Sequence, residues 1–156
     1  MTSSRPEDLL ARIAPGERLL IDTSVTLSYL TGTESTSRSA TDLFDGCIAT
    51  GRNVAVLSAV SVGELLVRPF ARGAAAVATI EGFLRHFGDV RVREVTYEIA
   101  REGARLRAAT GLPMPDALII ATALIERVDQ VLTNDDAWRR RLADVAPDLA
   151  VLSLAD

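Results

Sequence analysis

Residues 18–24 read Arg-Leu-Leu-Ile-Asp-Thr-Ser, and this stretch decides the fold class. Its apolar run at residues 19–21 predicts a buried strand, and Asp22 follows directly at the carboxyl end of that strand. Thr23 and Ser24 can cap a short helix that comes next. The stretch therefore predicts a strand that passes at once into a helix, with a carboxylate at the junction.

The rest of the chain repeats this alternation. Apolar runs predict further strands at residues 54–57, 131–132 and 149–154, and the alternation of residues 90–95 predicts another short strand. Helical spacing of apolar residues and helix-capping signals predict helices between them. Alternating strands and helices of this kind predict a three-layer α/β/α sandwich, in which helices cover both faces of a mainly parallel central sheet.

Local signals mark where some of the helices begin and end. Ser58 or Ser61 can start a helix that is kinked or ended at Pro69. The polar run at residues 31–39 predicts a loop. Glu64 therefore falls near the beginning of a helix that follows a strand.

The length and composition indicate one globular domain. The chain has 156 residues, of which 48% are hydrophobic and 24% are charged, which suits a domain with a buried core. Its longest nearly apolar stretch, residues 117–125, is far shorter than the roughly 20 residues needed to cross a bilayer. Residues 1–8 carry both charge signs and lack the apolar run of a signal peptide. We therefore expect a cytoplasmic protein with no membrane segment.

Several chemistries are excluded by residues that the chain lacks. It contains no lysine, so it has neither a Walker-type phosphate-binding lysine nor a Schiff-base lysine. His86 is the only histidine, and the absence of a Gly-x-Ser-x-Gly elbow argues against Ser-His-Asp hydrolysis. The net charge of −4 gives no overall attraction to nucleic acid. A nucleic-acid substrate would therefore have to be held by a local arginine patch or through bound cations.

Four acidic residues stand out by their places in this pattern. Asp22 and Asp135 directly follow predicted strands, and Glu64 and Asp116 lie near the beginnings of helices. If the strands are parallel, these positions meet at one edge of the sheet. Carboxylates gathered there would repel one another and would be costly to desolvate unpaired, so the cluster calls for cations. Hard oxygen ligands select Mg²⁺ or Mn²⁺.

A second interpretation of these acids stays open from spacing alone. An aspartate at a strand end or helix start commonly caps the helix and complements its dipole. Taken singly, each of the four positions fits capping better than catalysis. Only their combination favours a functional site.

Four stretches of the chain resemble the ordered motifs of VapC-type PIN domains, the toxin ribonucleases of toxin–antitoxin systems. The stretches are Leu-Ile-Asp-Thr-Ser at 20–24, Ser-Val-Gly-Glu-Leu at 61–65, Met-Pro-Asp-Ala-Leu-Ile-Ile-Ala at 114–121 and Val-Leu-Thr-Asn-Asp at 131–135. The order and the expected sheet positions match over nearly the whole chain. The resemblance implies a PIN-like fold and a Mg²⁺- or Mn²⁺-dependent endoribonuclease, the toxin of a type II toxin–antitoxin pair.

The resemblance also assigns residues to roles. Asp22, Glu64, Asp116 and Asp135 correspond to the acidic quartet that holds the metal. Thr23 and Thr133 match hydroxyl positions that support the quartet, and the neighbouring carboxylate of Asp136 can substitute or assist. Residues 19–156 would form the PIN-like domain and residues 1–18 an N-terminal extension, since members of the family often begin almost at the first strand.

Candidate partners follow from the resemblance and from the arginines. It implies an RNA substrate, a VapB-like antitoxin whose peptide occupies or covers the acidic groove, and a homodimer. Arg68, Arg72 and the run from Arg139 to Arg141 are candidates for holding RNA phosphates, although a solvated helix face is the favoured interpretation of any one of them.

Two rival functions remain open. A Mg²⁺-dependent phosphatase also places an aspartate after its first strand, but Asp22-Thr23-Ser24 lacks the second aspartate of the usual Asp-x-Asp pattern. A PIN-like module that binds RNA or protein without catalysis is the other alternative. It ranks below the nuclease because all four acids are present.

Overall fold

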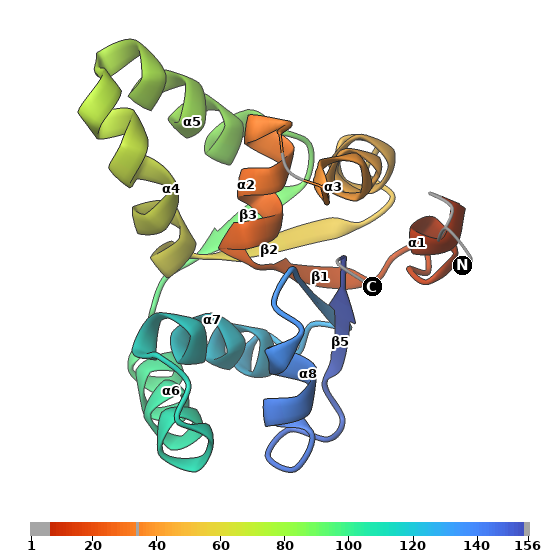
Figure 1. The fold of residues 1–156 in the computed structure, drawn as a ribbon, viewed down its shortest axis with the longest axis vertical. Coiled ribbons are helices and arrows are strands. Elements are labelled where there is room, and N and C mark those ends of the chain that lie inside the picture. The colour runs from red at the N-terminus through yellow and green to blue at the C-terminus, as the bar shows by residue number, and fades with distance from the viewer. Residues whose placement is uncertain (1–6, 34, 155–156) are drawn as a thin grey trace.

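The computed structural model describes residues 7–33 and 35–154, which form five strands and the helices that cover them (Figure 1). All five strands are parallel and lie in the order β3-β2-β1-β4-β5. The strands are β1 (Arg18–Ile21), β2 (Val54–Ser58), β3 (Val90–Arg93), β4 (Gln130–Thr133) and β5 (Ala150–Ser153). The predicted parallel sheet is confirmed, and all five predicted strands are found within a few residues of their expected bounds.

Helices cover both faces of this sheet, which confirms the three-layer sandwich (Figure 1). One face carries α2 (Thr23–Thr31), α3 (Ser37–Leu43), the π-helical segment η1 (Phe44–Ile48), α4 (Ala59–Arg72) and α5 (Ala74–His86). The other face carries α6 (Tyr97–Thr110), α7 (Met114–Ile125) and α8 (Ala137–Leu142). The short helix α1 (Glu7–Ala11) packs against α3 (Figure 1).

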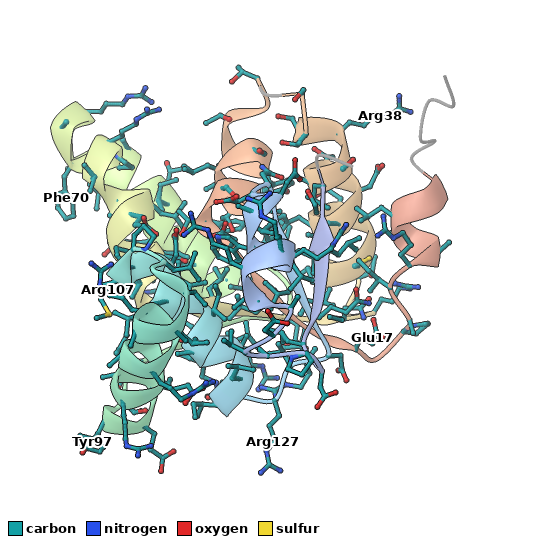
Figure 2. All side chains as sticks on the ribbon, turned by 60° about the horizontal axis from the view of Figure 1, so that its bottom comes forward. Glu17, Arg38, Phe70, Tyr97, Arg107 and Arg127 are labelled. Carbon is teal, nitrogen blue, oxygen red and sulfur yellow. The ribbon has the colours of Figure 1, made fainter. Side chains whose placement is uncertain are left out.

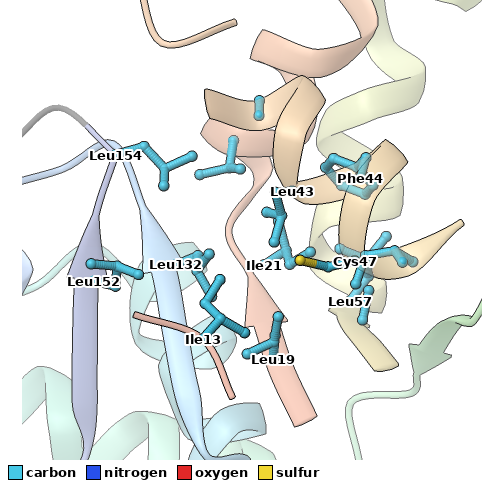
Figure 3. Packing of buried hydrophobic residues seen from close by; sticks show 14 of the residues in the cluster. Ile13, Leu19, Ile21, Leu43, Phe44, Cys47, Leu57, Leu132, Leu152 and Leu154 are labelled. Atoms are coloured by element: carbon cyan, nitrogen blue, oxygen red, sulfur yellow. The ribbon is translucent and has the colours of Figure 1, made fainter. Parts of the chain in front are cut away.

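The period of the strands divides the core between the two faces. Leu19 and Ile21 of β1 belong to the cluster under α2, α3 and α5, whereas Leu20 belongs to the cluster under α6 and α7. Successive side chains of a strand point to opposite faces, so a run without polar residues supplies both clusters. Figure 3 shows the first cluster, in which Leu57 and Leu132 of the neighbouring strands pack beside β1.

The predicted loop at residues 31–39 is wrong at both ends, because α2 continues to Thr31 and α3 begins at Ser37. The Ser37 hydroxyl donates to the Ser28 carbonyl at 2.9 Å, and the hydroxyls of Ser28 and Thr36 are 2.8 Å apart. These local bonds hold the start of α3 against the end of α2, so polar residues that suggest a loop begin a helix here.

Pro69 does not end α4, which continues to Arg72. A proline inside a helix removes one backbone hydrogen bond and crowds the preceding turn. Here the proline stands in the last turn of the helix, where few hydrogen bonds follow it. Gly73 then ends α4, with its amide bonded to the Pro69 carbonyl at 3.0 Å.

The segment before β1 is hydrogen-bonded to the residues that directly precede β2. Arg52 donates to the Ile13 carbonyl at 2.7 Å, and the Asn53 side chain donates to the carbonyls of Ala14 and Glu17 at 2.8 and 3.0 Å. β1 includes Arg18, one residue before the predicted domain boundary. Residues 1–6 of the predicted extension lie outside the described residues, and its separation from the domain stays a prediction.

The most apolar helix, α7, is a core element. Six of its residues are buried, and it packs against α6 along its length. Such burial on nearly all sides is expected for a helix that is apolar nearly all round. Among the helices of the described residues, none combines the length and the apolar character that a membrane span requires.

Candidate functional site

The four predicted acids line one pocket at the carboxyl ends of the central strands. Asp22 and Asp135 follow the neighbouring strands β1 and β4, while Glu64 comes from α4 and Asp116 from the first turn of α7. The pocket has a volume of about 670 Å³. Residues up to 113 positions apart in the sequence (22 to 135) are thus brought together by the parallel order of the strands.

These carboxylates lie at different depths. Asp22 is only 6% exposed, Asp116 is half-buried, and Glu64 and Asp135 are exposed. The pocket is therefore acidic from its buried floor to its rim.

Two hydroxyl groups hold the Asp22 carboxylate. Thr133 of β4 and Ser24 of α2 each donate to its Oδ2 atom at 2.9 Å. The Ser24 oxygen also accepts from the Asn134 amide at 3.2 Å, and the Thr133 oxygen accepts from the Asp135 amide at 3.0 Å. The loop after β4 is thus bound to the start of α2 through the groups that orient Asp22.

The capping interpretation holds for Asp135 and, through the helix dipole, for Asp116 in the first turn of α7. Asp22 precedes α2 with extended backbone, and its side chain makes no capping hydrogen bond. Glu64 lies in the second turn of α4, too far along to cap it. Asp135, in contrast, accepts the Ala137 amide at 2.9 Å and so helps to begin α8. Helix capping therefore does not explain why Asp22 and Glu64 lie in this pocket.

The electrostatics of the pocket disfavour charge on its inner acids. The pKa of Asp22 is raised to about 6, because its burial and the neighbouring charge of Asp116 outweigh the hydrogen bonds from Thr133 and Ser24. Burial also raises the pKa of Asp116, and the charges of Glu64 and Asp135 add to that shift. Arg141 acts in the opposite direction on Asp116. The inner carboxylates thus have too little positive charge beside them to offset their own negative charge.

The supporting residues predicted from the sequence occupy three different places. Thr133 contacts Asp22 as described, and Thr23 Oγ1 donates to Oε1 of Glu64 at 2.8 Å. Asp136 lines the pocket, but its Oδ1 accepts from the Ser153 hydroxyl of β5 at 2.6 Å. Two of the three therefore bind members of the quartet, while Asp136 binds the edge of the sheet.

The predicted phosphate-binding arginines are not gathered at one point. Arg68 and Arg72 line a second groove of about 450 Å³ between α2 and α4, which shares Glu64 with the acidic pocket. Arg139 is directed toward β5, where its Nε atom is 3.4 Å from the Val151 carbonyl. Arg141, two residues further on, is the arginine whose charge acts on Asp116.

Sequence reasoning missed three polar residues of the site. Ser24 binds Asp22, Ser61 lies 2.8 Å from the Thr23 hydroxyl, and Asn134 donates to the Ser24 carbonyl at 3.3 Å. Serine is too common in this chain for spacing to single these residues out. The position of Ser61 one helical turn before Glu64 is the one signal that could have identified it.

The donor set fits a hard divalent cation. Four carboxylates supply the oxygen ligands that Mg²⁺ and Mn²⁺ prefer, and the raised pKa values of Asp22 and Asp116 show that the pocket favours added positive charge. Within residues 7–33 and 35–154, however, no three acidic, histidine or cysteine side chains are already close enough to hold a metal ion. The exposed carboxylates of Glu64 and Asp135 would therefore have to move toward the inner acids when a cation binds.

Comparison with known proteins places the chain in a family. The model of the PIN domain matches residues 19–143, a range that contains all four acids. A search of curated proteins finds no match.

Solved structures share the fold at low sequence identity. VapBC2 of Rickettsia felis, solved bound to a promoter DNA fragment, is 14% identical with a TM-score of 0.65, and the match covers 87% of this chain and 98% of that one. A toxin–antitoxin complex of Klebsiella pneumoniae is 19% identical with a TM-score of 0.63, covering 87% and 97%. The sarcin-ricin loop cleaving toxin VapC20 of Mycobacterium tuberculosis is 17% identical with a TM-score of 0.64, covering 78% and 93%. On the family match, the parallel sheet and the placement of its acids, the chain belongs to the PIN domain family.

Proposed function

We propose that this protein is a Mg²⁺- or Mn²⁺-dependent endoribonuclease and the toxin of a type II toxin–antitoxin pair. The observation that carries the proposal is the gathering of Asp22, Glu64, Asp116 and Asp135 in one pocket of a PIN domain. Their mutual repulsion and the burial of Asp22 create a demand for a cation that the described side chains meet only through Arg141.

The proposed roles of the four acids differ with their depth in the pocket. Asp22 and Asp116, the inner acids, would hold the cation most directly, and Glu64 and Asp135 at the rim would complete its ligand set or orient water. Thr133 and Ser24 keep the Asp22 carboxylate in place. When bound, the cation supplies a Lewis acid that offsets charge on the phosphate and makes water a better nucleophile. Hydrolysis then adds one water molecule across a P–O bond of the RNA backbone.

An RNA substrate agrees with the surroundings of the pocket. With a net charge of −4, the chain needs local contacts to hold a polyanion. Arg68 and Arg72 line the groove next to Glu64, and Arg141 acts on Asp116 from α8. Cleavage of the sarcin-ricin loop by the similar VapC20 toxin supports RNA as the substrate class.

The antitoxin and the dimer are part of the same proposal. The groove beside the acidic pocket has an apolar floor of Leu27, Leu30 and Leu65, and two apolar residues of α4, Val67 and Phe70, are each 68% exposed. Figure 2 shows Phe70 on the outer side of α4, pointing away from the body of the molecule. Because similar structures were solved as toxin–antitoxin complexes, we assign this groove and the acidic pocket to a VapB-like peptide, and propose that the toxin forms a homodimer.

The proposal is tested by incubating total RNA with the purified, antitoxin-free chain in Mg²⁺, Mn²⁺ or EDTA. Asp116→Asn, purified identically, controls for contaminating ribonuclease. Asp148→Asn makes the same change at an exposed site outside the acidic pocket. We expect metal-dependent cleavage by the wild type and by Asp148→Asn, and at least a hundredfold slower cleavage by Asp116→Asn.

Other outcomes identify the rivals. Hydrolysis of a phosphomonoester such as p-nitrophenyl phosphate, with RNA left intact, would favour the phosphatase. Metal-independent RNA binding without cleavage would favour the binding module. Full cleavage by Asp116→Asn would contradict the assignment of the site.

A further inference from the structure

Three charged residues follow one another along the wall of the groove between α2 and α4. Glu64, Arg68 and Arg72 are spaced four residues apart on α4, so they lie on one side of that helix, and all three line the groove. At a helical rise of about 1.5 Å per residue, the row is about 12 Å long. Glu64 also lines the acidic pocket. The groove is therefore negative where it joins that pocket and positive at its other end.

The floor of this groove is apolar. Its apolar residues come from three helices and are Leu27 and Leu30 of α2, Leu65 of α4 and Ile80 of α5. Val67, which also lines the groove, is 68% exposed. Figure 1 shows α4 and α5 as a helical hairpin that extends beyond the sheet. Exposed apolar side chains gathered in a groove are typical of a surface that another molecule covers.

The two arginines of the groove have no acidic partner within the part of the chain that the structure describes. The ion pairs found there join other residues, and both Arg68 and Arg72 are exposed. Arg72 stands in the last turn of α4, where a positive charge complements the helix dipole. Arg68 lies one turn earlier, where that effect is weaker. Both guanidinium groups are thus available to the carboxylates of a ligand.

We propose that this groove binds an amphipathic peptide segment whose apolar side covers the floor and whose acidic residues bind Arg68 and Arg72. The inference rests on the proposed function, because it specifies the chemistry of the partner peptide assigned to this groove. RNA at the rim can also reach the two arginines, but it would leave the apolar floor uncovered. A peptide accounts for both features. Because the groove changes sign along its length, the acidic residues lie at the end of the peptide that is remote from the acidic pocket.

The test selects peptides from a displayed random library, each about 12 residues long so that a helical peptide spans the groove. Peptides that also bind Arg68→Glu/Arg72→Glu are removed, and the remainder are labelled with fluorescein for anisotropy measurements. We expect them to combine spaced apolar residues with acidic residues toward one end. Their dissociation constants should be about 10- to 100-fold higher for Arg68→Glu/Arg72→Glu. Peptides whose acidic residues are changed to arginine should prefer this variant to the wild type.

A matched control reverses two other exposed arginines. Arg85 and Arg101 line neither the groove nor the acidic pocket, so Arg85→Glu/Arg101→Glu makes the same change in net charge away from both. Its affinity for the selected peptides should equal that of the wild type. Arg68→Gln/Arg72→Gln removes the two charges without reversing them, and should weaken binding in the same direction if the glutamate variant folds poorly.

Several results would overturn the proposal. One is a selection that leaves no peptide, or only acidic peptides without apolar residues, and another is an equal loss of binding in Arg85→Glu/Arg101→Glu. Weaker binding of a labelled RNA oligonucleotide to Arg68→Glu/Arg72→Glu, with no peptide selected, would assign the arginines to RNA. A wild-type dimer that dissociates in this variant during sedimentation would assign the groove to a second copy of the chain. Peptide binding is measured without cleavage, so a chain that binds the peptides but leaves RNA intact would refute the nuclease alone.

Discussion

Replacement of Asp22 by asparagine should stabilise the metal-free protein at neutral pH. The carboxylate is 6% exposed and accepts two hydrogen bonds at one oxygen, Oδ2, from Thr133 and Ser24. The amide oxygen of asparagine can take the place of Oδ2 and keep both bonds. The substitution therefore removes a buried negative charge with little change in packing.

The magnitude follows from the raised pKa of this group. A change from 3.8 in the unfolded chain to about 6 in the folded one corresponds to about 3 kcal/mol, at about 1.4 kcal/mol per pKa unit. Because the folded state binds the proton more tightly, ionised Asp22 destabilises the protein above pH 6. That destabilisation disappears as the pH falls below about 4, where the carboxyl group is neutral in both states. Asp22→Asn should thus gain up to about 3 kcal/mol at pH 7 and almost nothing near pH 4.

Urea unfolding in EDTA, from pH 4 to pH 8, measures this difference directly. Groups that do not interact with Asp22 titrate alike in the two proteins, so subtracting one curve from the other isolates Asp22 and its interaction with Asp116. Added Mn²⁺ should reverse the order at pH 7, because it stabilises the chain that binds it. A difference in unfolding free energy that stays constant with pH, or a less stable variant at pH 7 in EDTA, would refute the reasoning.

Three further predictions concern the site and the fold. Mn²⁺ affinity of the wild type should fall as the pH drops through about 6, where Asp22 takes up a proton; calorimetric titration at several pH values checks this. Arg141→Gln should raise the KM for RNA about three- to tenfold, as expected for the loss of one phosphate contact of about 1 kcal/mol. Arg139→Gln is the matched control. Steady-state cleavage assays that give Arg141→Gln and Arg139→Gln the same KM would contradict the prediction. Gly88→Ala should lower the unfolding free energy by more than about 1 kcal/mol, since its Cβ would lie 2.5 Å from the Ile48 carbonyl at a φ of +44°, and thermal melting measures the loss.

Much of the fold was predictable because four of the five strands contain a short apolar run between polar residues, and β3 alternates valine with arginine. Leu19, Leu20 and Ile21 place apolar side chains on both faces of a buried strand. In a small domain, a short run of this kind seldom forms anything other than such a strand. The acids at strand ends and helix starts were predictable for the same reason, since parallel strands bring their carboxyl ends to one edge.

The hydrogen bonds that hold the acids were not predictable in the same way. Ser61 and Thr23 are 38 residues apart, and nothing in the pattern of either segment indicates that their hydroxyls meet. The start of α3 was missed because Ser37 binds the Ser28 carbonyl, a bond that depends on how two segments fold together. Arg139 and Arg141 are equivalent in sequence, and only the direction of α8 separates them.

The strand order has a consequence for when the site can exist. β1 lies at a topological switch point: the chain first builds β2 and β3 on one side of it, then crosses to build β4 and β5 on the other. One half of the polypeptide therefore supplies Asp22 and Glu64, and the other half supplies Asp116 and Asp135. During synthesis the emerging N-terminal half carries an incomplete ligand set. Under the proposed function, the four acids come together only after β4 has docked beside β1, so the ribosome must finish most of the chain before the site can form.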